Sequence, residues 1–136
     1  MEGDVFEVGG DNALNEIPII ADDIVYEGAA VGESSSAGTG RPLVAGDTFL
    51  GFSTRQCDNA GGLASAKRIE VYGKGVARLS VTGVSSTAQV GDSVYASDDN
   101  TFNLTASANS AIGKIIRWIT GAVCLVSFEA AYQRSL

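Results

Sequence analysis

Apolar and polar residues alternate along several short stretches of this chain, and turn-forming residues separate these stretches. The clearest example is 88–105, AQVGDSVYASDDNTFNLT, where a Gly-Asp pair opens one alternation and a polar cluster leads into a second. Glycine accepts positive φ angles, and Asp or Asn can bond the backbone two residues on, so both polar groups are typical of turns. The pattern predicts a β-hairpin, with Tyr95 and Phe102 facing the core and Gly91 at a backbone angle that a Cβ would strain.

The remaining strands are predicted from the same kind of pattern. Residues 24–31 are rich in β-branched and aromatic side chains, and 47–57 form a mostly apolar run that we expect to be buried on both faces. Two more hairpins are predicted, one between 67–73 and 76–82 about Gly-Lys-Gly, the other between 111–119 and 122–130. Short strands and 17 glycines indicate an all-β fold, a single-domain β-sandwich or barrel without a long helix.

The first 22 residues differ from the rest. They combine a short alternation, DVFEV, with an isoleucine cluster around Pro18, which breaks any helix begun before it. We expect 1–22 to be an extended N-terminal arm, mobile in the isolated protein and ordered on a partner, followed by a β domain at 23–136. Within that domain, 32–42 (GESSSAGTGRP) is predicted to be a flexible Ser/Gly-rich loop.

Length and composition indicate one compact core. A chain of 136 residues buries roughly two thirds of its unfolded surface, so it needs no metal or disulfide to fold. No run approaches the ~20 apolar residues of a membrane span, and no membrane partner is expected. The N-terminus is acidic where a secretory signal would be basic and then apolar, so we expect synthesis in the cytoplasm. Cys57 and Cys124 are then expected to be reduced, and most readily interpreted as small core residues.

Charge and residue types narrow the function classes. The net charge is −7, and the nine Lys and Arg residues are scattered along the sequence, whereas nucleic-acid binding needs a concentrated basic footprint. The chain has no histidine, which removes the usual general base and the commonest transition-metal ligand. A Ser/Lys nucleophile pair remains open, but nothing in the sequence favours one. We therefore expect no enzyme, no cofactor and no nucleic-acid partner.

Two stretches resemble ligand-binding loops only superficially. GESSSAGTG lacks the Lys-Ser/Thr ending of a phosphate-binding loop and does not open a helix. Residues 97–100, SDDN, lack the alternate spacing and the bidentate Glu of a calcium loop. We interpret the first as a flexible loop and the second as a turn, and expect no metal site.

Several motifs, taken in order, resemble those of the phage capsid cement, or head decoration, proteins. The motifs are GDVFEV, YGKGVARLSV, VGDSVYASDDNTFNLT and AIGKIIRWITGAVCLVSF, which together extend over most of the chain. In that family a Gly-Asp strand opens the chain, a Gly-Val strand follows, Gly-Asp-x-Val-Tyr leads to a turn and a Thr-containing strand, and Ile-Gly and Val-rich strands close it. The serine-rich loop at 32–42 and the RQCDNAGGLASAKR stretch depart from this pattern.

The resemblance implies a structural virion protein on the outer surface of a phage capsid. Such a protein bridges major capsid protein subunits and stabilises the head, and it contacts copies of itself as a homo-oligomer, with a trimer favoured over a dimer. The residues expected at the capsid or oligomer interface are Val5, Phe6, Ile17, Pro18, Ile19, Ile20, Arg41 and Arg55. The alternative is a sugar- or receptor-binding β module on a virion surface or tail, for which Trp118 would have to be exposed rather than in the core.

Overall fold

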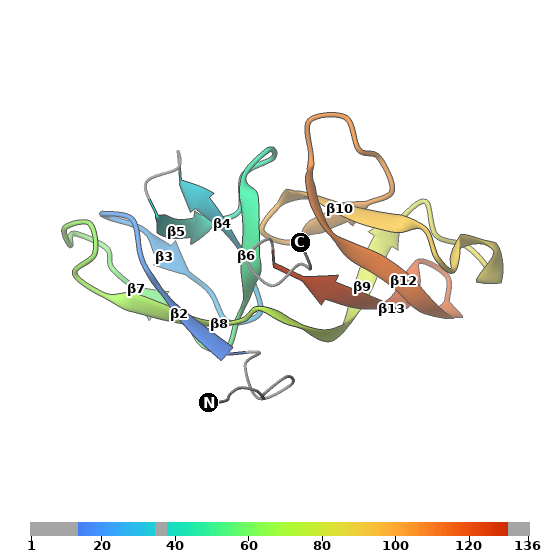
Figure 1. Ribbon diagram of the computed structural model, residues 1–136, viewed down its shortest axis with the longest axis horizontal. Helices are drawn as coiled ribbons and strands as arrows, with labels where there is room; N and C mark the ends of the chain where they lie inside the picture. The colour runs from blue at the N-terminus through green and yellow to red at the C-terminus, as the bar shows by residue number, and fades with distance from the viewer. Residues whose placement is uncertain (1–13, 35–37, 131–136) are drawn as a thin grey trace, which may run out of the picture.

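The computed structural model describes residues 14–34 and 38–130, and almost every element in them is a strand (Figure 1). One five-stranded sheet has the order β2-β8-β6-β4-β5. Its strands are β2 (Leu14–Pro18), β4 (Ala30–Ser34), β5 (Thr39–Pro42), β6 (Thr48–Ser53) and β8 (Arg68–Tyr72). A short ladder joins β3 (Ile24–Val25) to β7 (Cys57–Asp58).

The later part of the chain forms a closed barrel with the order β10-β11-β9-β13-β12. Its strands are β9 (Lys74–Thr82), β10 (Ser93–Asp98), β11 (Thr101–Asn103), β12 (Ser110–Thr120) and β13 (Val123–Glu129). The one helical element among the described residues is a 3-10 turn, η2 (Thr87–Gln89), which Ser86 caps. The predicted all-β fold is confirmed.

Two of the three predicted hairpins are confirmed. Strand β10 pairs with β11, and β12 pairs with β13. The third is wrong, because β8 belongs to the five-stranded sheet and β9 to the barrel, so that Gly73 marks a crossover between them and not a turn. Figure 1 shows β8 leading directly into β9. Alternation predicted both strands correctly, but it says nothing about which partner each strand takes.

Two expectations about the first half of the chain are corrected. The predicted strand at 24–31 is divided between β3 and β4 by a turn containing Gly28, which has a φ of 79°. The predicted loop at 32–42 contains most of a hairpin, because β4 and β5 pair antiparallel from Val31–Pro42 to Ser34–Thr39. Small residues there allow close strand packing, and a Cβ on Gly40 would come within 3.1 Å of Ile17.

The expectation of a separate arm at 1–22 is wrong for its described part. Strand β2 pairs along its whole length with β8, with Ile17 opposite Ile69. Ile19 has no exposed surface and bridges to Gly40 of β5, so β2 and β5, the two outer strands of the sheet, meet there. The isoleucine cluster is buried because the edge of β8 offers it both backbone partners and an apolar surface. Residues 1–13 lie outside the described part of the chain.

Two hydrophobic clusters form the core. One lies within the sheet and contains Ile17, Ile19, Val25, Ala29, Val31, Leu50, Cys57, Ile69 and Val71. The other fills the barrel and extends into β4 and β6, because Phe49 and Phe52 pack against Phe102 and Phe128 with ring centroids 4.8 to 6.2 Å apart. The sheet and the barrel therefore share one continuous aromatic core.

Bulges change which barrel residues face this core. Strand β12 carries a bulge opposite β10 and another between Ile115 and Arg117, so Ile115 is buried while Ile116 is about half exposed. Trp118 packs, partly buried, against the barrel core. In β10 the buried residues are Val94 and Ala96, so the prediction that Tyr95 faces the core is wrong. Phe102 is buried, as predicted.

Candidate interaction surface

Strand register places a row of side chains across the outside of the barrel. Val76 on β9 is opposite Ser127 on β13, and Ser127 is opposite Lys114 on β12. Lys114 is in turn opposite Ser93 on β10. Successive side chains of a strand point to opposite faces, so the neighbours of these residues face the core and these face solvent.

Adjacent rows on the same side carry further cations. Arg78 and Arg117 both lie opposite Leu125, one on each side of it, and Lys74 lies opposite Glu129. We call this surface the basic barrel face. It consists of Lys74, Val76, Arg78, Lys114, Ile116, Arg117 and Leu125.

Charge is strongly segregated in this molecule. Strands β9, β12 and β13 contain four Lys or Arg residues and one carboxylate, a net charge of +3. The other five cations and fifteen carboxylates of the chain sum to −10. The interpretation of the cations as scattered is therefore wrong for the folded protein, because β9 and β12, which flank β13, bring four of them onto one surface. A surface of this kind attracts a partner that is acidic.

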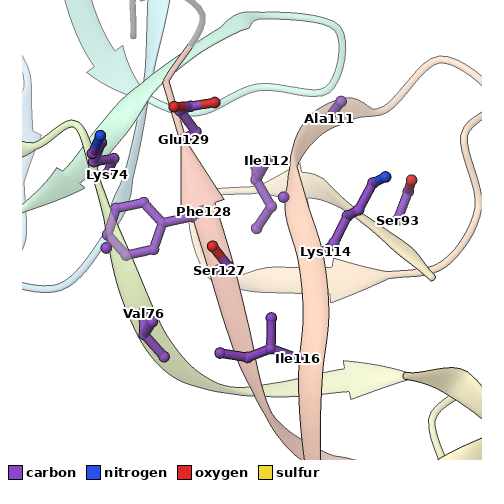
Figure 2. A pocket seen from close by; sticks show the side chains of 12 residues that line it. Lys74, Val76, Ser93, Ala111, Ile112, Lys114, Ile116, Ser127, Phe128 and Glu129 are labelled. Carbon is purple, nitrogen blue, oxygen red and sulfur yellow. The ribbon is translucent and has the colours of Figure 1, made fainter. Parts of the chain in front are cut away.

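An open groove of about 690 Å³ lies on the basic barrel face. Figure 2 shows Val76 and Ile116 toward one end of it, Phe128 along it, and Lys74 with Glu129 toward the other end. Val76 is 57% exposed and Ile116 is 48% exposed. Lys114 and Ser93 lie on the β12 and β10 side. The groove therefore combines apolar contact area with flanking cations, which is typical of surfaces that bind another protein segment.

Gly113 explains how β12 and β13 approach closely enough to form the floor of this groove. A Cβ at this position would lie 2.1 Å from the carbonyl oxygen of Ser127 and 2.8 Å from the Cα of Phe128. No side chain fits there. The glycine thus keeps the two strands in register beneath Lys114 and Ser127.

Most residues expected at an interface lie elsewhere. Ile17 and Ile19 are buried in the sheet core, and Pro18 and Ile20 are half-buried at its margin, so the isoleucine cluster is not a free contact surface. Val5 and Phe6 lie outside the described residues. The structure brings none of the four described positions, Ile17 to Ile20, onto the basic barrel face.

Arg41 has a structural role. Its Nε and Nη2 donate to both carboxylate oxygens of Asp47, at 3.0 and 2.8 Å. Asp47 also accepts from the Val44 amide, and its hydrogen bond raises the pKa of the Arg41 guanidinium above the usual value. This bidentate pair fixes the turn between β5 and β6.

Arg55 is exposed beside a smaller groove near β7 and β8. The groove is lined by Arg55, Gln56, Cys57, Asp58, Lys67, Arg68, Ile69 and Glu70. Its charges are mixed, and Lys67 donates to the carbonyl oxygen of Asp58. Arg55 therefore remains available for contact, but apart from the four cations of the basic barrel face.

The described residues contain little that suggests reaction chemistry. No group of three or more Cys, Asp or Glu side chains in 14–34 and 38–130 is arranged to hold a metal ion. Cys57 and Cys124 are buried free thiols, as interpreted from the sequence, and burial raises the pKa of both. A raised pKa keeps a thiol protonated and slow to react. The SDDN stretch is a turn, in which Asp98 accepts from the Asn100 amide and the Thr101 hydroxyl.

Trp118 does not form an open platform for a sugar ring. Its inner side packs on the barrel core, and its Nε1 donates to the carbonyl oxygen of Gly121 at 3.0 Å. The indole thus closes the β12–β13 hairpin.

Sequence reasoning missed the basic barrel face, although part of the signal was present. The polar positions of the predicted strands at 76–82 and 111–119 carry Arg78, Lys114 and Arg117, with no carboxylate among them. What the sequence did not give was the order β9-β13-β12, which makes these strands neighbours.

The chain matches no protein-family model, and no curated protein is significantly similar to it. None of the described helical segments is long and apolar enough to cross a membrane. The surface chemistry of the barrel is thus the principal guide to function.

Proposed function

We propose that this protein is a structural virion protein that binds the outer surface of a phage capsid, bridges major capsid protein subunits and stabilises the head. The observation that carries the proposal is the basic barrel face, an exposed surface of cations and apolar side chains on an otherwise acidic β protein. The ordered motifs that resemble capsid cement proteins indicate which class of partner this surface has.

The partner is proposed to be a protein surface with carboxylates, not nucleic acid. Binding to phosphates depends on many simultaneous cation contacts, and a chain of net charge −7 is repelled by DNA at long range. A protein partner can instead place a few carboxylates opposite Lys114 and Arg117 and apolar side chains against Val76 and Ile116. Electrostatic complementarity of this kind favours the correct orientation during association.

The rigid, shared core suits a protein that reinforces a shell. Phe52 of the sheet and Phe128 of the barrel are in contact, so a load applied to the barrel is transmitted to the sheet through side-chain packing. The proposal includes no enzymatic activity, no cofactor and no membrane partner.

The first experiment asks whether the protein belongs to the particle. Mass spectrometry of purified virions of the virus that encodes the chain is expected to find it at high copy number. Its absence from purified particles would refute the proposed function.

The second experiment asks which surface binds. Co-sedimentation with undecorated heads is expected to show at least tenfold weaker binding for the double variant Lys114→Glu and Arg117→Glu. The matched control is Arg55→Glu, the same change of charge sign at an exposed arginine beside the smaller groove. If Arg55→Glu weakens binding and the double variant does not, the basic barrel face is not the docking surface. The proposed capsid-binding function would not be refuted by that result.

A further inference from the structure

Among the described residues, strand β9 has an open edge although it belongs to a closed barrel. It pairs with β13 from Lys74 to Ser80, but with β11 only at Val81 and Thr82. Within the described residues no strand pairs with the other side of β9 between Lys74 and Leu79. An unpaired edge of this length is a template for an added strand.

Backbone hydrogen bonds on either side of β9 show which groups this edge presents. The Val81 amide donates to Ala122, and the Gly73 carbonyl accepts from Ala130, so the odd-numbered residues of β9 are directed toward β13. In an antiparallel pair the alternate residues are directed the other way. Lys74, Val76 and Arg78 therefore present their amides and carbonyls at the open edge.

The side chains along this edge select the charge of its partner. Strand β9 (KGVARLSVT) contains Lys74 and Arg78 and no carboxylate. Two such edges placed together would bring cations close to cations, which disfavours β9–β9 pairing. The edge instead suits a strand that carries carboxylates and apolar residues.

The N-terminal segment has that composition. Residues 1–13 (MEGDVFEVGGDNA) contain four carboxylates and no Lys or Arg, and Asp4–Val8 combine two acidic residues with three apolar ones. Thirteen residues extend up to roughly 43 Å, and a six-residue edge is only about 20 Å long. The N-terminal segment is therefore long enough to cover the β9 edge, and its charge is opposite to that of Lys74 and Arg78.

The same backbone geometry indicates whose N-terminal segment binds. Ile19 donates to the Lys67 carbonyl and Thr54 to the Glu70 carbonyl, so odd residues of β8 are directed toward β2 and even residues toward β6. Along β8 and β9, which are separated by a bend at Gly73, β2 and β13 therefore pair with the odd-numbered residues, and the open edge of β9 is on the side of the even-numbered residues. Leu14, opposite Tyr72, is on the side away from its own open edge.

We infer that residues 4–8 of one copy add as a strand to the β9 edge of a second copy. Repeating this contact joins copies head to tail, and the ring closes where the rotation between copies allows it. The inference goes beyond capsid binding, because it concerns how copies of the chain join each other and holds or fails in the absence of any capsid.

The test compares the full chain with a variant lacking residues 2–12. Light scattering during size-exclusion chromatography is expected to show an oligomer for the full chain and a monomer for the deletion. Amide hydrogen exchange is expected to slow at least tenfold at Val76 and Arg78 in the oligomer compared with the deletion variant. The amides of Ala77 and Leu79, directed toward β13, serve as internal controls and should be equally protected in both.

Charge exchange tests the specificity of the contact. Arg78→Glu is expected to dissociate the oligomer, and combining it with Asp4→Lys and Glu7→Lys is expected to restore association. Arg117→Glu is the matched control, since Arg117 lies on the same face but not at the edge, and it should leave the oligomer intact.

Several outcomes would overturn the inference. A monomeric full chain with protected Val76 and Arg78 amides would show that the segment binds its own edge. A full chain in which these amides exchange as in the deletion variant, or become protected only after capsid is added, would show that no second copy occupies the edge. An oligomer that survives the deletion would place the contact elsewhere.

Discussion

Phe52 of β6 and Phe128 of β13 meet edge to face, with ring centroids 4.8 Å apart and ring planes at 83°. One ring comes from the five-stranded sheet and the other from the barrel, so this contact joins the two parts of the core. Both side chains are buried.

Phe52→Ala is expected to lower the free energy of unfolding by about 3–5 kcal/mol, because it removes a buried ring that contacts Phe49, Phe102 and Phe128. Urea unfolding monitored by circular dichroism measures the change. Leu63→Ala, at a side chain that is 80% exposed, should change stability by less than about 0.5 kcal/mol. A loss below about 1 kcal/mol for Phe52→Ala would contradict the shared core.

Gly113→Ala is expected to destabilise the protein by about 1–3 kcal/mol, since the added Cβ has no space beside the Ser127 carbonyl. Strand propensity alone predicts the opposite sign, because glycine weakens a strand interior more than alanine does, and Ala111→Gly on the solvent side of β12 measures the size of that propensity effect. Thermal unfolding of both variants gives the comparison, and a Gly113→Ala variant as stable as the parent would contradict the steric explanation.

Gly91→Val is expected to cost on the order of 1–3 kcal/mol for a different reason. Gly91 has a φ of 94°, which L side chains rarely adopt, although no other heavy atom lies near the position of a Cβ. Gly91→Asn should cost less than Gly91→Val, because asparagine tolerates positive φ better than a β-branched residue. If the valine variant melts at the same temperature as the parent, backbone strain is not the reason for this glycine.

Ile19→Ala is expected to cost about 2–5 kcal/mol, because Ile19 is fully buried in the sheet cluster. Deleting residues 2–20 removes β2 as well and should prevent stable folding, whereas deleting residues 2–12 should leave the fold intact. Circular dichroism and chemical unfolding of the two truncations distinguish these cases. A folded 2–20 truncation would show that the β2–β8 ladder is dispensable.

Asp99→Asn is expected to stabilise the protein at pH 7 more than at pH 3. Burial, with a smaller contribution from the nearby Asp98 carboxylate, raises the pKa of Asp99 in the folded state. The stability that the protonated carboxyl contributes is complete below the unfolded pKa and is lost as the pH rises through the raised, folded pKa. Asparagine stays neutral throughout and avoids that loss.

Melting temperatures of the parent and Asp99→Asn, measured between pH 3 and pH 7, check whether the stabilisation by asparagine grows as the pH rises. The comparison variant Asp98→Asn alters a side chain that accepts hydrogen bonds from Asn100 and Thr101. It should therefore be destabilised at pH 7. An Asp99→Asn variant with the same pH dependence as the parent would contradict the assigned cause.

The alternation of apolar and polar residues predicted the strands of the barrel well. It did not predict long-range strand pairing or bulges, because both depend on partner strands. The hairpins at β10–β11 and β12–β13 depend on short turns whose residues, Asp98 and Gly121, act within their own neighbourhood. The pairing of β2 with β8 joins positions at least fifty residues apart and leaves no local signal. Bulges in β12 likewise depend on the partner strands, so the exposure of Ile116 could not be predicted from alternation.

The candidate site was harder to predict than the fold. Arg41 and Arg55 stood out in the sequence as single cations, but one is bound to Asp47 and the other lies beside a mixed groove. The four cations of the basic barrel face are each unremarkable in their own strand. Only the strand order brings them together, and strand order is a property of the whole fold.

The crossover at Tyr72 and Gly73 has a consequence for protein engineering. Leu14 lies opposite Tyr72, and the Ala130 amide donates to Gly73, so both ends of the described chain arrive at adjacent positions. Such a chain is suited to circular permutation, with a short linker joining the ends and new termini opened at the exposed loop around Leu63. A cargo joined directly at Leu14 or at Ala130 would likewise be attached to the same region of the molecule.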